Sequence, residues 1–370
     1  MVSRGGGSML KIIREERFLG AAIATSLVFL LFGDRIHSDY SNPFYLTLVL
    51  AWLFFVILGS VLAVVRHADH LAERLGEPYG TLVLTLAVTA IEAMSISAVM
   101  LHGANNPTLV RDTLMGVIMI ILNGMVGVSL LAGGWRHREQ QYNLQGANAY
   151  LCVIIPLAVL GLVLPNTTQT TAGPTLSGMQ ETFLSIMSIC LYAAFLVIQT
   201  GRHRGFFVLE AEGLPHHAEG GSLWKHVFFL AAYMLPVVFL AEHLAPPTDY
   251  VIETLKAPVA LGGLAIAVLV ATPEAIGATK AAFNNHLQRA MNIFLGSVLA
   301  TIGLTIPAML LIGRLTGHTI FLGVEHGNQV LLLLTLFLSA ITFTSGRTNI
   351  LQGLVHVLLF FAYILLIFEG

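Results

Sequence analysis

The sequence predicts an all-α protein that crosses a membrane about eleven times. Of its 370 residues, 56% are hydrophobic and only 10% are charged. A soluble core could not bury so much apolar surface, so the lipid bilayer must be the solvent of this chain. A further observation, two similar apolar stretches that each carry one glutamate, predicts that the chain has two related halves.

Apolar runs near the length of one bilayer crossing, about 20 residues, define the expected helices. The first run is not followed by a small-residue cleavage site, so we interpret it as a retained helix rather than a signal peptide. The expected helices lie at 18–32, 44–65, 79–101, 110–133, 149–165, 178–199, 225–243, 257–279, 289–313, 328–345 and 348–368.

Basic residues predict the orientation, because Lys and Arg accumulate on the cytoplasmic side of membrane helices. With the N-terminus in the cytoplasm, fourteen of the 18 basic residues fall on that side and four on the other. Eleven crossings then put the C-terminus outside the cytoplasm.

The chain has no long basic or acidic run of the kind that binds nucleic acid. We therefore expect its partners to be the lipid bilayer, cations and protons, in a bacterial inner membrane.

The longest polar connection, residues 200–224, is expected to be a cytoplasmic loop that divides the chain. Residues 1–43 form an N-terminal segment with the first helix. Residues 44–199 and 225–370 then each hold five helices. An odd number of crossings per repeat means that the second repeat enters the membrane from the opposite side, as in transporters with inverted repeats.

Each predicted repeat carries one glutamate inside an apolar helix. Glu92 lies in the stretch Leu84–Ala98, and Glu274 follows 182 residues later in VLVATPEAIGATK. A charge at the bilayer centre costs about 3 kcal/mol or more, so such residues usually face a cavity or a partner and mark an ion or proton path. The alternative is a protonated carboxyl that only links helices, but two copies in related surroundings favour an ion site.

Polar residues near the two glutamates are candidate ligands. Thr89 shares a helical face with Glu92, and Thr272 precedes Glu274 by two residues. In the helices that follow each glutamate lie Asn123 and Ser297, and Thr301 and Thr305 continue from Ser297 at spacings of four. Threonines in membrane helices often bond only to their own backbone, which remains the alternative. The expected cation and proton site comprises Glu92, Glu274, Thr89, Asn123, Thr272 and Ser297, with Glu92 and Glu274 as the metal-binding pair.

Pro273 adds a second source of oxygen ligands. Proline lacks a backbone donor and leaves the carbonyl of Leu269 without its helical partner, so we expect the helix to kink or break beside Glu274. Carboxylates and freed carbonyls suit hard cations such as calcium, sodium and potassium. The alternative is a kink that serves packing alone.

The stretches VTAIEAMSIS with LMGVIMIILNGMVG, and VATPEAIGATKAAFNN with NIFLGSVLATIGLTIP, resemble the paired alpha-repeats of the calcium/cation antiporter superfamily, and within it the bacterial ChaA-type calcium/proton antiporters. The resemblance spans most of the chain. It implies an eleven-helix exchanger with inverted repeats, in which Glu92 and Glu274 bind the cation and take up protons.

The residues and the resemblance together predict a secondary antiporter that exports a cation, with calcium as the first candidate, in exchange for protons. A sodium or potassium/proton antiporter is the alternative in the same class, and a cation channel the alternative in another. We expect no cofactor besides the transported ions. An intramembrane hydrolase is not expected, because the chain contains neither HExxH nor GxSxG.

Overall fold

The computed structural model describes residues 16–75, 79–102, 106–208 and 223–369. Most of the predicted 200–224 loop, residues 209–222, lies outside the described residues, as do residues 1–15. In the described part, nine helices are long and apolar enough to cross a membrane, and two shorter apolar helices accompany them. The predicted all-α class with about eleven crossings is therefore confirmed.

All eleven predicted crossings appear as helices. Two of them are interrupted by a π-helical segment, and a third ends in a π-helical segment. A two-residue antiparallel strand pair, β1 (Gln140–Gln141) with β2 (Arg347–Thr348), accompanies them in the described chain. In order the helices are α2 (Arg17–Ile36), α3 (Pro43–Leu75), α4 (Tyr79–His102), α5 (Leu109–Met119) with η1 (Ile120–Met125) and α6 (Val126–His137), α7 (Leu144–Ala158) with η2 (Val159–Val163) and η3 (Leu164–Asn166), α8 (Gly178–Thr200), α9 (Leu223–Glu253), α10 (Ala260–Phe283), α11 (Leu287–Ala300) with η5 (Thr301–Thr305) and α12 (Ile306–Thr316), α13 (His326–Thr342) and α14 (Ile350–Glu369), with the short 3-10 turn η4 (Arg204–Phe206) after α8.

Two helices continue well beyond their apolar runs. α3 has 33 residues and α9 has 31, whereas the sequence predicted 44–65 and 225–243. The additional turns still bury one face, for example Ala68 in α3 and Leu244 in α9. The hydropathy of the sequence therefore predicts the part of each helix that crosses the hydrocarbon layer. Packing against other helices stabilises the helical turns beyond it.

Helix α10 does not break at Pro273. It runs without interruption from Ala260 to Phe283, with Pro273 inside it. Membrane helices tolerate proline because neighbouring groups compensate for the missing bond. Two π-helical segments, η1 and η5, lie instead in the helices that follow the two glutamates, at matching positions of the two halves. Such π-helical turns often occur at functional sites.

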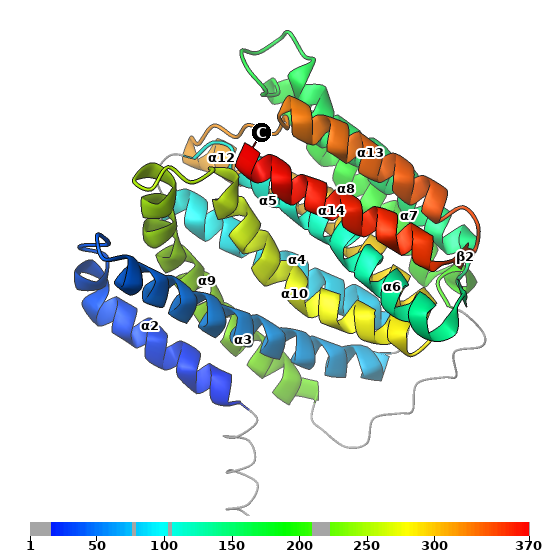
Figure 1. Cartoon of the computed structure of the whole chain (residues 1–370), viewed down its shortest axis with the longest axis horizontal. Helices are drawn as coiled ribbons and strands as arrows, with labels where there is room; N and C mark the ends of the chain where they lie inside the picture. The colour runs from blue at the N-terminus through cyan, green and yellow to red at the C-terminus, as the bar shows by residue number, and fades with distance from the viewer. Residues whose placement is uncertain (1–15, 76–78, 103–105, 209–222, 370) are drawn as a thin grey trace, which may run out of the picture.

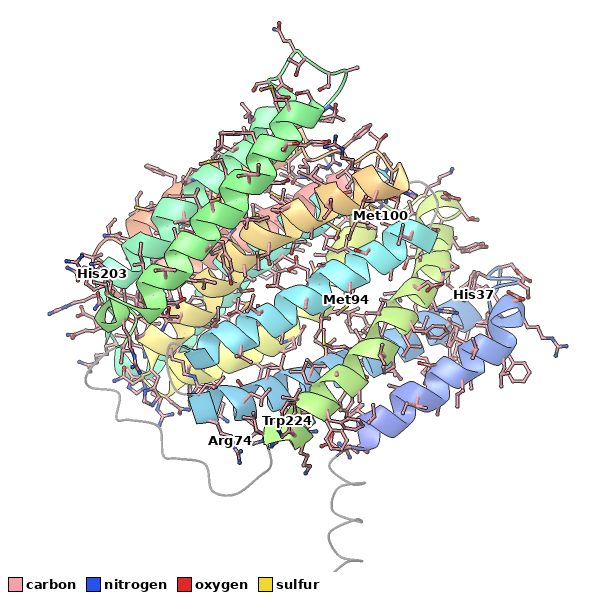
Figure 2. The ribbon with its side chains drawn as sticks, turned by 180° about the vertical axis from the view of Figure 1, so that it is seen from behind. His37, Arg74, Met94, Met100, His203 and Trp224 are labelled. Carbon is pink, nitrogen blue, oxygen red and sulfur yellow. The ribbon has the colours of Figure 1, made fainter. Side chains whose placement is uncertain are left out.

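Helices α4 and α10 lie in the middle of the bundle and run in opposite directions (Figure 1). On one side of them pack α2, α3 and α9, which share a separate apolar cluster that includes Phe29, Leu53 and Tyr233. On the other side lie α7, α8, α13 and α14. Figure 2 shows the opposite face, where α4, with its labelled Met94 and Met100, lies between α9 and the α11 to α12 helix.

Candidate functional site

The two glutamates predicted to bind ions are buried inside the bundle. Glu92 on α4 is 1% exposed, and Glu274 on α10 is 4% exposed. The two carboxylates accept hydrogen bonds from Ser297 and Thr301, which lie one turn apart on the same helix, so the glutamates lie close to each other. Glu92 lies in the first half of the chain and Glu274 in the second, so each half contributes one carboxylate.

One helix supplies hydroxyl groups to both carboxylates. Ser297 Oγ on α11 donates to Glu274 Oε2 at 2.5 Å, and Thr301 Oγ1 in η5 donates to Glu92 Oε2 at 2.7 Å. Thr305 Oγ1 is a more distant donor to the same Glu92 oxygen, at 3.5 Å. Ser297 and Thr301 are four residues apart, so their hydroxyls share one helical face about 6 Å apart along the axis. This hydroxyl row connects the two glutamates.

The second oxygen of Glu92 has no partner among the described residues. Glu92 Oε1 is buried and accepts no hydrogen bond. Buried polar atoms in proteins are normally hydrogen-bonded, and an unpaired buried carboxylate oxygen is costly. A bound cation or a proton would supply the missing interaction, so this atom is the most direct sign of an ion site in the structure.

The structure brings some of the predicted ligands to the glutamates and leaves others apart. Ser297 contacts Glu274, and Thr89 is buried on α4 one turn before Glu92. The hydroxyl of Thr272 donates to the carbonyl of Val268 in its own helix at 2.6 Å. This bond corresponds to the alternative interpretation of a threonine in a membrane helix.

Asn123 takes part in a second buried network instead. Its Nδ2 donates to Thr335 Oγ1 at 2.8 Å, and its Oδ1 lies 3.2 Å from His356 Nδ1. Thr342 Oγ1 lies 3.0 Å from the other nitrogen of His356. The network joins η1 to α13 and α14, and none of the hydrogen bonds described for Asn123 reaches Glu92 or Glu274.

Thr301 and Thr305 were not among the predicted site residues, although the sequence shows their spacing from Ser297. The structure gives both a hydrogen bond to Glu92. The available signal was their spacing of four from Ser297, which places all three hydroxyls on one face of a helix. That spacing cannot show which neighbouring helix the face meets, and here it meets the glutamate of the other half.

The arrangement offers only oxygen atoms to a bound ion. The described residues contain no group of three or more His, Cys, Asp or Glu side chains suited to a resident metal. A cation at this site would be bound by two carboxylates and hydroxyl groups, oxygen ligands of the kind that hard cations prefer. The same two carboxylates can take up protons when the cation is absent.

The chain is similar to known ion transporters. The chain matches the family model "Sodium/calcium exchanger protein" over residues 45–201 and 225–369. It is 42% identical over 320 residues to the "Sodium-potassium/proton antiporter ChaA" of Escherichia coli (strain K12), covering 84% of this chain and 86% of that protein. It is 40% identical over 316 residues to the "Putative ionic transporter y4hA" of Sinorhizobium fredii (strain NBRC 101917 / NGR234), with the same coverage.

Solved structures of low sequence identity share the fold. YfkE superposes with a TM-score of 0.74 at 18% identity, covering 96% of this chain and 100% of that one. The "H+/Ca2+ Exchanger CAX" gives a TM-score of 0.61 at 12% identity, covering 95% and 88%. Two halves with one buried glutamate each, the family match over both halves and these relatives confirm the expected resemblance and a transporter rather than an enzyme. The chain is therefore an integral membrane protein of the sodium/calcium exchanger protein family.

Proposed function

We propose that this protein is a secondary antiporter that exports a cytoplasmic cation in exchange for protons, by alternating access to one site. The observation that carries the proposal is the Glu92 and Glu274 pair, buried together and connected by the hydroxyl row of α11 and η5. Two carboxylates can hold either one divalent cation or protons, because each bound proton removes the charge that attracts the cation. Competition for one site provides the coupling that an antiporter needs.

Calcium is the first candidate for the transported cation. The two carboxylates carry the charge that balances one divalent ion, and their surroundings offer further hydroxyl oxygens. Within this proposal Glu92, Glu274, Ser297, Thr301 and Thr305 are the ligand candidates supported by geometry. Thr89 stays a candidate through its position one turn before Glu92.

The remaining two predicted ligands, Asn123 and Thr272, make their described hydrogen bonds to groups other than the two glutamates.

Sodium or potassium is the second candidate, because the relative that is 42% identical is named a sodium-potassium/proton antiporter. Carboxylates and hydroxyls do not distinguish these ions by their chemistry alone. The number of oxygens around the ion would decide, since calcium takes six to eight oxygen ligands, as a rough guide.

The arrangement of the whole chain in the membrane also belongs to the proposal. We propose two inverted repeats, 44–199 and 225–370, with residues 1–43 outside the symmetry and the 200–224 connection on the cytoplasmic side. The two segments of the family match and the opposite directions of α4 and α10 support this division. Bacterial relatives support placement in a bacterial inner membrane.

Transport in everted membrane vesicles tests the proposal. With an acid interior imposed, calcium, sodium and potassium are offered in turn, and the transported cation should accumulate inside against its gradient. A cation channel would only let the cation equilibrate.

The variants Glu92→Gln and Glu274→Gln should each abolish exchange while the protein still inserts, because glutamine keeps the size of the side chain and loses its charge. Glu369→Gln is the matched control, since Glu369 is an exposed glutamate at the end of α14. Native exchange by either site variant would remove that glutamate from the mechanism.

A further inference from the structure

A small polar cavity lies between four helices near the ion site. It has a volume of about 10 Å³, roughly the space for one water molecule. Its lining side chains come from α4, α7, α8 and α11. Among them Thr85, Tyr150 and Gln199 carry polar groups, although each of these residues is at most 5% exposed. Buried polar groups that converge on one cavity call for a functional explanation.

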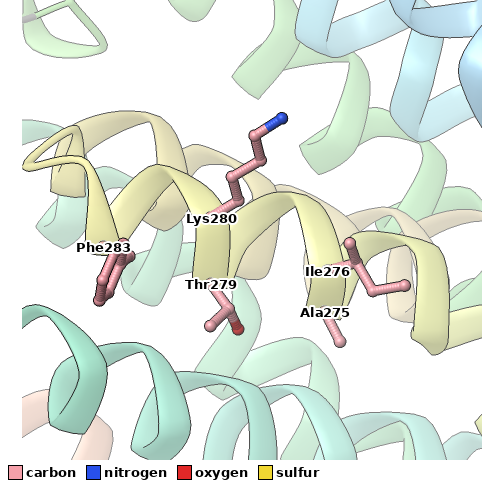
Figure 3. Close-up of a pocket in the computed structure, with 5 residues that line it drawn as sticks. All are labelled: Ala275, Ile276, Thr279, Lys280 and Phe283. Atoms are coloured by element: carbon pink, nitrogen blue, oxygen red, sulfur yellow. The ribbon is translucent and has the colours of Figure 1, made fainter.

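A larger groove on the outer surface of α10 has a different character. Figure 3 shows its five lining side chains, all of which belong to α10. Ile276 is 54% exposed and Phe283 is 45% exposed, as expected for apolar side chains that contact lipid. The cavity between the four helices is therefore the stronger candidate for an ion path.

The polar groups of the cavity lie close to one another and to the ion site. Gln199 Nε2 on α8 donates to the hydroxyl of Tyr150 on α7 at 2.9 Å. A Cβ on Gly296 of α11 would lie 3.6 Å from the Tyr150 hydroxyl oxygen and 3.7 Å from the Thr85 hydroxyl oxygen. The absence of a side chain at Gly296 thus leaves room between the two hydroxyls. Gly296 directly precedes Ser297, which donates to Glu274, so the cavity adjoins the ion site.

Helix α4 connects the cavity to the other glutamate. Thr85, Thr89 and Glu92 follow at spacings of four and three, so they share one face of the helix. Thr85 and Glu92 are about 10.5 Å apart along the axis, and the buried Thr89 lies between them. A row of buried oxygen atoms therefore leads from the cavity to the carboxylate.

Phe207 closes one end of the cavity. It follows the short turn η4, and it is 1% exposed. Its ring packs edge-on against two of the lining residues, Tyr150 and Phe195, with a distance of 5.5 Å between ring centroids in both cases. The three aromatic rings together cover the polar groups below them.

Two asparagines hold the Phe207 segment in place. Asn292 Nδ2 on α11 donates to the carbonyl oxygen of Phe207 at 2.8 Å, and Asn143 Nδ2 donates to the carbonyl oxygen of Gly205 at 3.2 Å. Asn292 lies one turn closer to the beginning of α11 than Gly296 does. In the proposed orientation α11 begins at the cytoplasmic side, so Phe207 lies at the cytoplasmic end of the cavity.

We propose that this cavity is the cytoplasmic entrance to the ion site and that Phe207 is its gate. The inference rests on the proposed antiport, because it gives the transported cation a route to Glu92. A cavity with room for one water molecule is too small for a hydrated cation, so the Phe207 ring has to move before a cation passes. That movement breaks the hydrogen bond from Asn292, and Thr85 and Thr89 then offer oxygens to the entering ion.

The reactivity of a cysteine inside the cavity tests this gate. Thr85→Cys is introduced after the two exposed native cysteines, Cys152 and Cys190, have been replaced by alanine. The purified full-length protein in detergent is treated with a cationic reagent, trimethylammonium-ethyl methanethiosulfonate, and mass spectrometry follows the rate of labelling. The introduced cysteine should react slowly while Phe207 is present.

Two variants should open the entrance to different extents. Phe207→Ala should raise the labelling rate by about tenfold or more, because it removes the packing that keeps the segment closed. Asn292→Leu keeps a similar side-chain volume and removes one hydrogen bond to the segment, so it should raise the rate by about threefold to tenfold. Phe206→Ala is the matched control and should leave the rate unchanged, because the Phe206 ring packs on His203 instead, 4.8 Å between centroids.

A second reporter separates gate opening from general loosening of the fold. Ser60→Cys places the probe at a fully buried position of α3, and its labelling should not respond to Phe207→Ala. Equal acceleration at both probes overturns the proposal, as does an unchanged rate at position 85 in a folded Phe207→Ala protein. If Phe207→Ala does not fold, Asn292→Leu decides by the same criterion. No transport is measured, so loss of antiport with this labelling pattern intact would contradict the proposed function and leave the gate standing.

Discussion

The two hydroxyl donors to Glu92 lie at different distances, which predicts different contributions to ion binding. Thr301 donates at 2.7 Å and Thr305 at 3.5 Å. Valine has a similar shape to threonine without the hydroxyl, and a hydrogen bond to a charged group contributes about 1.5–3 kcal/mol. We expect Thr301→Val to weaken the apparent cation affinity by about tenfold or more, and Thr305→Val by less than about threefold. Half-saturation concentrations in everted vesicles measure both, and equal effects would contradict this role of Thr301.

Cation and proton should compete at the two glutamates, so the apparent cation affinity should weaken as the pH falls. A carboxylate that holds a proton has lost the charge that attracts the cation, and a buried site offers little water in compensation. Cation binding in detergent, measured from alkaline to mildly acidic pH, tests this directly. If the two glutamates only formed a structural link beside a separate site, acid would change the stability of the protein while the binding constant stayed constant.

At the level of residues, the sequence could predict the glutamates but not all of their partners. A carboxylate inside an apolar membrane helix is energetically costly, so its presence alone predicts an ion or proton site. A second carboxylate at the related position of the other half strengthened this prediction. Helical spacing shows which residues share a face, but it does not show which helix that face meets. For this reason Asn123 was predicted beside the ion site, whereas its hydrogen bonds reach Thr335 and His356.

Helices α10 and α5 pack closely at one glycine, which predicts a sharp difference between two neighbouring positions. A Cβ on Gly263 would lie 2.6 Å from the backbone nitrogen of Thr113 and 2.7 Å from the carbonyl carbon of Asp112. A Cβ on Gly262 would meet its nearest atom, Ile252 Cδ1, at an ordinary 3.5 Å. We expect Gly263→Ala to destabilise the protein by about 1–3 kcal/mol, the usual cost of overpacking, because backbone atoms cannot move aside as a side chain can.

Thermal unfolding in detergent measures this effect, and Gly262→Ala is the matched control on the same helix. Both substitutions replace glycine by alanine, so they change helix propensity equally and differ only in the space available. Equal melting temperatures for the two variants would show that α5 and α10 can separate without cost.

At the level of elements, hydropathy located every crossing but not the ends or the irregular turns. The extensions of α3 and α9 depend on packing against other helices, which no apolar run records. The π-helical segments η1 and η5 have no proline inside them, and the one proline expected to interrupt a helix beside the site, Pro273, does not. The helix ends and the π-helical segments depend on contacts between helices, so they cannot be predicted from the sequence of one helix alone.

At the level of the whole molecule, an odd number of crossings separates the two ends of the chain. In Figure 1 the C-terminal end of α14 and the beginning of α2 lie at opposite ends of the bundle. The same odd number within each proposed repeat explains why α4 and α10 run in opposite directions and bring their glutamates together from the two halves. The helix count and the geometry of the site are thus connected.

The orientation of the molecule is the last prediction, and it follows from the basic residues. Fourteen of the 18 Lys and Arg residues lie on one side of the proposed topology and four on the other, so we expect a cytoplasmic N-terminus and a C-terminus outside the cytoplasm. A reporter fused after Gly370 that is active only outside the cytoplasm should be active, and a reporter that works only in the cytoplasm should be silent. Fusions after Thr200, at the end of α8, should give the reverse pattern and serve as the control. A cytoplasmic signal at Gly370 would show that one of the expected crossings, the short first or the short fifth, does not cross the membrane.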